Sequence, residues 1–182
     1  NKKIELENLI NENQFFKSEN EYLKKIIDDN NTFSKNFYLT KVLVDNQSPY
    51  LKSIIISKGF NNGIKKGAAV KDRFFFVGKI VNVNYLTSRV LLASDLNSKI
   101  PIIIEPGNIN AILSGNGNND YADLEFLPKQ NNVSEGNLVF TSGADAIIPP
   151  AIPIGKIFEK GGKKFVKFYS DFDQLNYVKV SK

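Results

Sequence analysis

Positions 6–27 of the chain carry an apolar repeat with alternating steps of three and four residues. The repeat positions are Leu6, Leu9, Asn13, Phe16, Asn20, Leu23 and Ile27. This alternation is the a/d pattern of a coiled coil. We therefore predict a coiled-coil helix over residues 1–30, which ends in the turn-favouring residues from Asp28 to Thr32.

Two a positions of this repeat hold asparagine, at Asn13 and Asn20. An asparagine at an a position sets register and strand number at some cost in stability. The flanking charges agree, because Glu12 would face Lys17 of a partner helix. The pattern thus predicts a parallel homodimer. The alternative is a single amphipathic helix that packs on its own domain, which would gain nothing from asparagine at two seam positions.

Beyond residue 36 the helical period does not return, and short β-branched and aromatic runs alternate with Gly, Asn, Asp and Pro clusters. Such runs predict strands. We expect them near 37–45, 52–58, 74–84, 87–93, 100–104, 110–114, 121–127, 138–141, 153–159, 164–169 and 175–180. Many short strands at roughly even spacing favour barrels or a sandwich, so the predicted fold class is mainly β.

The amino-acid types present in the chain exclude most common catalytic mechanisms. The chain has no cysteine and no histidine, which excludes thiol catalysis, Ser-His-Asp arrangements and the commonest transition-metal ligands. Ser114 and Ser142 precede glycines, and we interpret both as strand-end turns. The segment 115–120 is rich in Asn and Gly but lacks the spacing of a calcium loop. We predict no enzymatic activity, no cofactor and no metal site.

Aromatic residues are the better candidates for a partner surface. Phe74, Phe75 and Phe76 are consecutive, and on a strand Phe75 must face opposite to its neighbours. Either both faces of this strand are covered, or one phenylalanine is available to a partner. The segment 163–169 interleaves aromatic residues with lysines, as in some nucleic-acid platforms. An amphipathic barrel strand gives the same string, so both interpretations stay open.

Several segments occur in an order that is typical of one family. They are Gly59–Gly67, Ser88–Asp95, Asn97–Pro101, Ala111–Gly117, Leu124–Pro128, Gly136–Gly143, Ile152–Ile157 and Asp171–Leu175. From Lys41 onward the chain resembles the periplasmic part of the MreC family of bacterial rod-shape-determining proteins. One departure is Phe75, where the family more often has glycine.

The resemblance implies a fold that periodicity alone does not. It implies two small β-barrels, the second inserted into the first, after the coiled-coil helix. The first barrel would take residues 37–68 and 140–182, and the second would take residues 69–139. This arrangement is similar to a chymotrypsin-type double barrel without its catalytic residues.

The resemblance also implies a function and partners. It implies a non-enzymatic scaffold of the cell-wall elongation complex, which binds a class B penicillin-binding transpeptidase and acts with MreD, RodA and MreB to maintain rod shape. Position 1 is not methionine, so we expect an upstream segment. The resemblance places a single membrane anchor there, with the domain on the periplasmic side of the inner membrane. β-edges could also pair between dimers and build filaments.

The net positive charge of the chain leaves nucleic-acid binding as an alternative function. Residues 1–30 carry five Lys and seven Asp or Glu, a net charge of −2. Since the whole chain has a net charge of +5, residues 31–182 carry a net charge of +7. A basic β-barrel domain can bind single-stranded nucleic acid. The lysines are scattered and not run together, which favours the scaffold, without nucleic acid, over this alternative.

Overall fold

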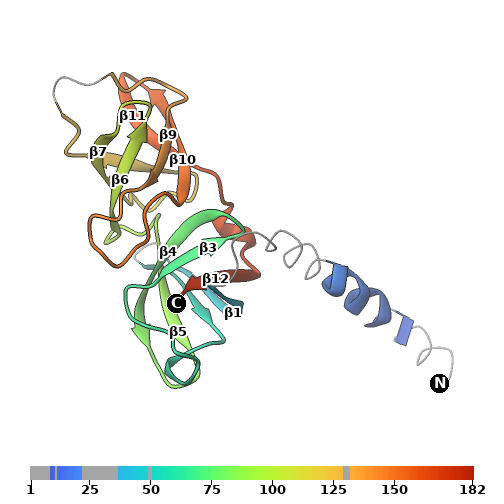
Figure 1. Cartoon of the computed structure of the whole chain (residues 1–182). Helices are drawn as coiled ribbons and strands as arrows, with labels where there is room; N and C mark the ends of the chain where they lie inside the picture. Colours follow the sequence, from blue (N-terminus) through green and yellow to red (C-terminus); the bar gives the residue numbers. More distant parts are fainter. Residues whose placement is uncertain (1–8, 11, 22–36, 49–50, 129–131) are drawn as a thin grey trace. The chain divides into compact units, whose positions relative to one another are not determined.

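The structure is a computed structural model that describes residues 9–10, 12–21, 37–48, 51–128 and 132–182. The chain divides into two units, residues 1–36 and residues 37–182. In the first unit, residues 9–10 and 12–21 are helical, as the repeat predicted (Figure 1). The predicted seam positions Leu6, Leu23 and Ile27 lie outside the described residues. None of the helices described is both long and apolar enough to cross a membrane.

The second unit begins with a closed six-stranded barrel in the order β1-β12-β3-β4-β5-β2. Every neighbouring pair in it is antiparallel. Its strands are β1 (Phe37–Ser48), β2 (Leu51–Ile56), β3 (Ala69–Asp72), β4 (Phe75–Val83), β5 (Ser88–Leu92) and β12 (Tyr177–Ser181). The last strand of the chain therefore closes the barrel that the first strand opens.

A second closed barrel lies between β5 and β12 in the sequence, in the order β10-β11-β8-β7-β6-β9. Its strands are β6 (Lys99–Glu105), β7 (Ile109–Ser114), β8 (Tyr121–Glu125), β9 (Leu138–Thr141), β10 (Pro153–Lys160) and β11 (Lys163–Phe168). The prediction of two barrels with the second inserted into the first is confirmed.

The predicted boundaries of the barrels are wrong. Strands β3, β4 and β5, placed in the second barrel through the range 69–139, belong to the first, because β3 pairs with β12 and β5 pairs with β2. Strands β10 and β11, placed in the first barrel through the range 140–182, belong to the second. Strand β3 was not predicted, because it is only four residues long and two of these residues are charged.

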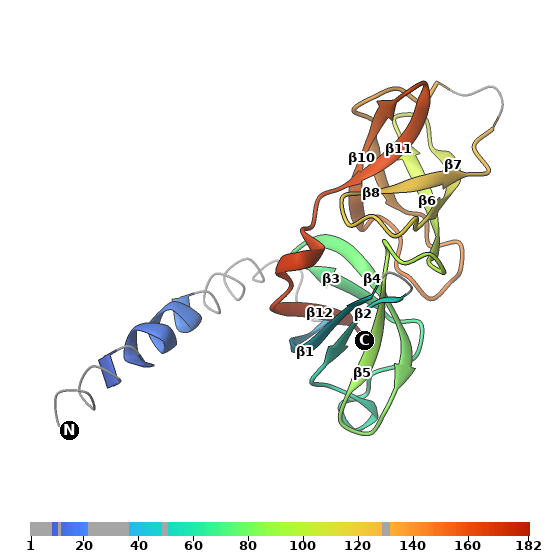
Figure 2. The ribbon, with the colours of Figure 1, turned by 180° about the vertical axis from the view of Figure 1, so that it is seen from behind.

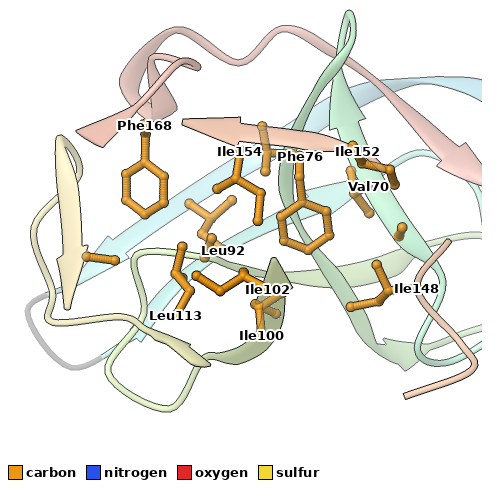
Figure 3. Close-up of a cluster of buried hydrophobic side chains, with 14 of the residues drawn as sticks. Val70, Phe76, Leu92, Ile100, Ile102, Leu113, Ile148, Ile152, Ile154 and Phe168 are labelled. Atoms are coloured by element: carbon orange, nitrogen blue, oxygen red, sulfur yellow. The ribbon is translucent and has the colours of Figure 1, made fainter. Parts of the chain in front are cut away.

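Burial alternates along strands that turn one face into a barrel. In β6, Ile100, Ile102 and Ile104 are fully buried, while Pro101 and Ile103 between them are only partly buried. The two barrels share one continuous cluster of buried side chains. Figure 3 shows Val70 and Phe76 of the first barrel in this cluster with Ile154 of the second. The barrels thus bury apolar surface against each other.

Both described barrels are closed, which bears on self-association. Pairing between β-edges of neighbouring dimers needs a strand with unpaired backbone groups. Each strand of the two barrels has two hydrogen-bonded neighbours in the closed order. The expected filament contact through β-edges is therefore not supported by this fold.

A buried carboxylate fixes the first crossing between the barrels. Asp95 lies on the segment between β5 and β6 and is fully buried. Its Oδ2 accepts a hydrogen bond from the backbone N–H of Lys52 at 2.6 Å, and its Oδ1 accepts from the backbone N–H of Asn97 at 2.8 Å. The crossing is thereby tied to β2 of the first barrel.

We expect Asp95→Ala to lower the free energy of unfolding by about 2–4 kcal/mol, because it leaves buried N–H donors without an acceptor. Denaturant titration followed by circular dichroism measures this. Asp120→Ala, at an exposed carboxylate, is the control and should change stability by less than about 0.5 kcal/mol. Equal effects of the two substitutions would contradict this role of Asp95.

Candidate partner-binding surface at the junction of the barrels

The structure separates the three consecutive phenylalanines. Phe76 is fully buried in the shared core, and Phe75 points to the other face of β4, where it is half-buried. Strand geometry places the two rings on opposite faces of β4, and Val77, on the face of Phe75, is also fully buried. Phe74 was expected on the strand but lies in the turn between β3 and β4, next to Arg73 with its φ of 51°. There the Phe74 side chain is 48% exposed.

Phe75 contacts an aromatic residue that the sequence did not indicate as its partner. The rings of Phe75 and Tyr169 lie 5.0 Å apart between centroids, at an angle of 45°. Tyr169 follows β11 of the second barrel and is 38% exposed. Phe75 and Tyr169 therefore pack against each other where the two barrels meet, and the exposed Phe74 directly precedes Phe75 in the chain. We call these three aromatic residues the junction patch.

The return crossing that carries Tyr169 is held at several points. The backbone N–H of Tyr169 donates to the carbonyl of Ile154 at 3.1 Å. Phe172 is fully buried, and its ring lies 4.7 Å from that of Phe168. Asn119 Nδ2 donates to Asp173 Oδ1 at 2.7 Å. The junction patch is thus presented by a fixed segment, which limits the entropy lost on binding.

Charged groups of β3 and β12 lie beside the patch. Lys71 and Lys179 are directly opposite each other in the register, and the Lys179 ammonium lies 5.6 Å from the Phe74 ring centroid. Burial lowers the pKa of Lys71, and the Lys179 charge lowers it further. Burial raises the pKa of Asp72, against the opposing charges of Arg73 and Lys179. The patch is therefore aromatic at its centre and charged at its border.

The segment 163–169 does not form a platform for stacked bases. Phe165 stacks on Phe158 with an interplanar angle of 28°, and Tyr121 meets both rings edge-on. Phe168 is buried. Base stacking needs ring faces that are open to solvent, and these faces contact other rings. The geometry therefore disfavours the nucleic-acid alternative.

The two serines near glycines have structural contacts. The Ser142 hydroxyl accepts a hydrogen bond from the Ala144 N–H at 3.2 Å. Ser114 is buried at the end of β7, and its hydrogen bond to Glu125 contributes, after that of Lys99, to a lowered pKa of this carboxylate. Within the described ranges, no group of three or more Asp or Glu side chains is arranged to hold a metal ion.

One closed six-stranded barrel inserted into another defines this chain as a double-barrel β-protein. Residues 42–182 match the family profile described as rod shape-determining protein MreC, barrel core. The chain belongs to this family.

Individual relatives agree with the assignment. A cell shape-determining protein MreC from Cereibacter sphaeroides is 34% identical over 134 residues, 73% of this chain and 44% of that protein. A solved MreC structure has a TM-score of 0.80 at 24% identity and covers 92% of this chain and 99% of that chain. The complex between PBP2 and MreC from Helicobacter pylori contains the same fold, with a TM-score of 0.58 at 12% identity, over 80% of this chain and 98% of that chain. The chain spans less than half the length of the curated relatives that it matches.

The positions of the phenylalanines predict different costs of substitution. Phe76→Ala should lower the free energy of unfolding by about 3–5 kcal/mol, because it opens a cavity in the core. Phe74→Ser should cost less than about 1 kcal/mol, since it removes an exposed ring and a weak cation–π contact. Denaturant titration of both variants checks this. Comparable losses would mean that Phe74 is a core residue and not part of a surface.

Proposed function

We propose that this chain is a non-enzymatic scaffold of the cell-wall elongation machinery that binds a penicillin-binding transpeptidase through the junction patch. The observation that carries the proposal is the exposure of Phe74 and Tyr169, with Tyr169 packed on Phe75 where the two barrels meet. Exposed aromatic clusters with a charged border are typical of protein interfaces. The family assignment supports a role in cell shape.

The transpeptidase is proposed as partner by analogy with one relative. The structure of the Helicobacter pylori protein is described as a complex between penicillin-binding protein PBP2 and MreC. That protein shares the fold with this chain. We extend its partner class to this chain, where the junction patch is the surface that best fits such a contact. A scaffold of this kind would favour one conformation of the enzyme by binding it preferentially.

The N-terminal helix is proposed to make the scaffold a parallel dimer. Of the seam positions, Leu9, Asn13, Phe16 and Asn20 lie in the described helix, and all four side chains are exposed in the single chain. Exposed leucine and phenylalanine at a/d spacing gain free energy when a second helix covers them. The asparagines would then fix the register of the pair.

The proposed scaffold also has a location in the cell and further partners. We place the barrels on the periplasmic side of the inner membrane, tethered by an anchor upstream of residue 1. MreD, RodA and, across the membrane, MreB are the further partners proposed for the assembled complex. In this arrangement the coiled coil brings two copies of the junction patch into one dimer.

We expect the 182-residue chain to sediment as a dimer at tens of micromolar, an order set by the marginal length of under four heptads. Removing residues 1–30 should leave a folded monomer, because the second unit contains its own core. Analytical ultracentrifugation of both chains measures this. A monomeric full chain would contradict the seam.

A double substitution tests the register within the same experiment. Replacing Asn13 and Asn20 by Ile should stabilise the helix but favour higher oligomers or mixed register. The matched control replaces Asn8 and Asn11 by Gln, because these two asparagines lie off the a/d positions. This control should leave the dimer unchanged. A clean dimer in both double variants would place Asn13 and Asn20 outside the seam.

Binding to the transpeptidase should depend on the junction patch. Phe74→Ser should weaken binding of the full chain to the periplasmic part of the enzyme from the same organism by roughly 1–3 kcal/mol, the range of a modest hot spot. Tyr169→Ser should have a similar effect. Biolayer interferometry measures both affinities.

Phe126 provides the control for this measurement, because its side chain is 80% exposed on the second barrel. Phe126→Ser removes a comparable ring and should leave the affinity unchanged. If Phe74→Ser and Tyr169→Ser both bind the enzyme with unchanged affinity while keeping their fold, the patch is not the interface.

A further inference from the structure

The positive charge of the chain is concentrated in one part of the first barrel. Residues 46–94 carry eight Lys or Arg and one Asp, a net of +7, whereas residues 95–182 carry nine Lys and ten Asp or Glu, a net of −1. The segment 46–94 contains β2, β3, β4 and β5. The basic character of the protein is therefore a property of the first barrel and not of the inserted one.

Two neighbouring loops of this barrel expose large apolar side chains. The loop after β2 presents Phe60, which is 72% exposed, and the β4–β5 hairpin presents Tyr85 and Leu86, which are 69% and 60% exposed. Figure 2 shows both loops at the same end of the first barrel. We call these loops, residues 57–66 and 84–87, the barrel tip.

Backbone hydrogen bonds hold the two loops of the barrel tip together. The backbone N–H groups of Phe60 and Asn61 donate to the carbonyls of Asn84 and Tyr85, at 2.9 Å and 3.2 Å. Gly59 makes this approach feasible, because a Cβ there would lie 2.3 Å from the Asn84 carbonyl oxygen. The exposed rings are therefore held in place, and little conformational entropy is lost when they bind.

A pocket at the tip combines apolar and cationic groups. Phe60, Ile64, Val83 and Tyr85 contribute apolar surface to it, and Lys65 and Lys66 contribute their side chains. Both lysines are exposed. No carboxylate lies in the tip loops. This combination fits an anionic group next to an apolar one, as at the headgroup and glycerol region of a phospholipid.

The chain enters the first barrel at this same end. The backbone N–H of Ser57 donates to the carbonyl of Lys41 at 3.0 Å, and the Tyr38 hydroxyl lies 3.3 Å from where a Cβ of Gly63 would be. The start of β1 thus lies beside the tip. The tip and the start of β1 therefore lie at the same end of the first barrel.

We propose that the barrel tip binds the surface of an anionic lipid bilayer. Phe60, Tyr85 and Leu86 enter the interfacial region, where aromatic side chains are favoured, and Lys65 and Lys66 pair with lipid phosphates. Protruding apolar side chains beside the exposed Lys65 and Lys66 favour a fluid anionic surface over a folded acidic protein. A protein partner would need a groove that matches the fixed positions of the rings. This site is separate from the junction patch.

Vesicle binding of the full 182-residue chain tests the proposal. The chain should co-sediment with phosphatidylglycerol–phosphatidylcholine vesicles and not with phosphatidylcholine alone. Raising sodium chloride from about 0.05 to about 0.5 M should reduce the bound fraction, because salt screens the lysines. Lys65→Glu with Lys66→Glu should weaken partitioning roughly 20-fold or more, and Phe60→Ser should weaken it about 10-fold.

Matched variants on the second barrel control for net charge and ring loss. Lys156→Glu with Lys160→Glu changes charge equally at exposed sites, and Phe126→Ser removes an equally exposed ring. Both should bind vesicles almost as the unaltered chain does. The chain has no tryptophan, so Tyr85→Trp provides a single reporter whose emission should shift to the blue on anionic vesicles, while Phe126→Trp should not shift.

The outcomes separate cleanly. Loss of binding confined to the tip variants, with the shift confined to Tyr85→Trp, supports the proposal. Absence of vesicle binding overturns it, and so do equal losses in the tip and control variants. If vesicle binding is absent but Lys65→Glu with Lys66→Glu abolishes binding to the transpeptidase, the tip is a protein contact and the lipid proposal is wrong.

Discussion

The insertion of one closed barrel into another is the constraint on which the other features of this protein depend. The chain leaves the first barrel after β5 and returns only as β12. One neighbour of β1 is β2, which follows it directly, but the other is β12, about 140 residues later, as in the pair of Phe37 with Ser181. The first barrel cannot close before both crossings are in place. Contacts of such long sequence separation are formed slowly in folding. In exchange, the shared core and the buried Asp95 couple the stability of the two barrels.

This coupling explains how a small β-protein can present a defined surface. Phe75 comes from a strand of the first barrel, and Tyr169 comes from the segment that leaves the second. Neither barrel alone would form the junction patch. A change in the angle between the barrels would separate the two rings, so the binding surface depends on the packing beneath it. The Phe76 ring contributes to that packing one residue away from Phe75.

The sequence predicted local elements better than it predicted their partners. Each predicted strand overlaps an observed one, because alternation of apolar residues is a local signal. The four-residue strand β3 was missed, since Lys71 and Asp72 leave too few apolar positions to show a period. The allocation of strands to barrels was wrong because hydrogen-bond partners such as β3 and β12 are far apart in the sequence. For the same reason the contact between Tyr169 and Phe75 could not be predicted. The opposite directions of Phe75 and Phe76 could be, because successive side chains of a strand point to opposite faces.

The shared core and the hydrogen bonds of Asp95 imply that the two barrels unfold as one cooperative unit. The most direct test is equilibrium unfolding of two single-tryptophan variants in guanidinium chloride, with Tyr85→Trp reporting on the first barrel and Phe126→Trp on the second. If the barrels unfold as one unit, the two unfolding curves will coincide in midpoint and slope, as for a two-state transition. Two separate transitions, one for each reporter, would show instead that the barrels unfold independently and that the shared core does not couple them.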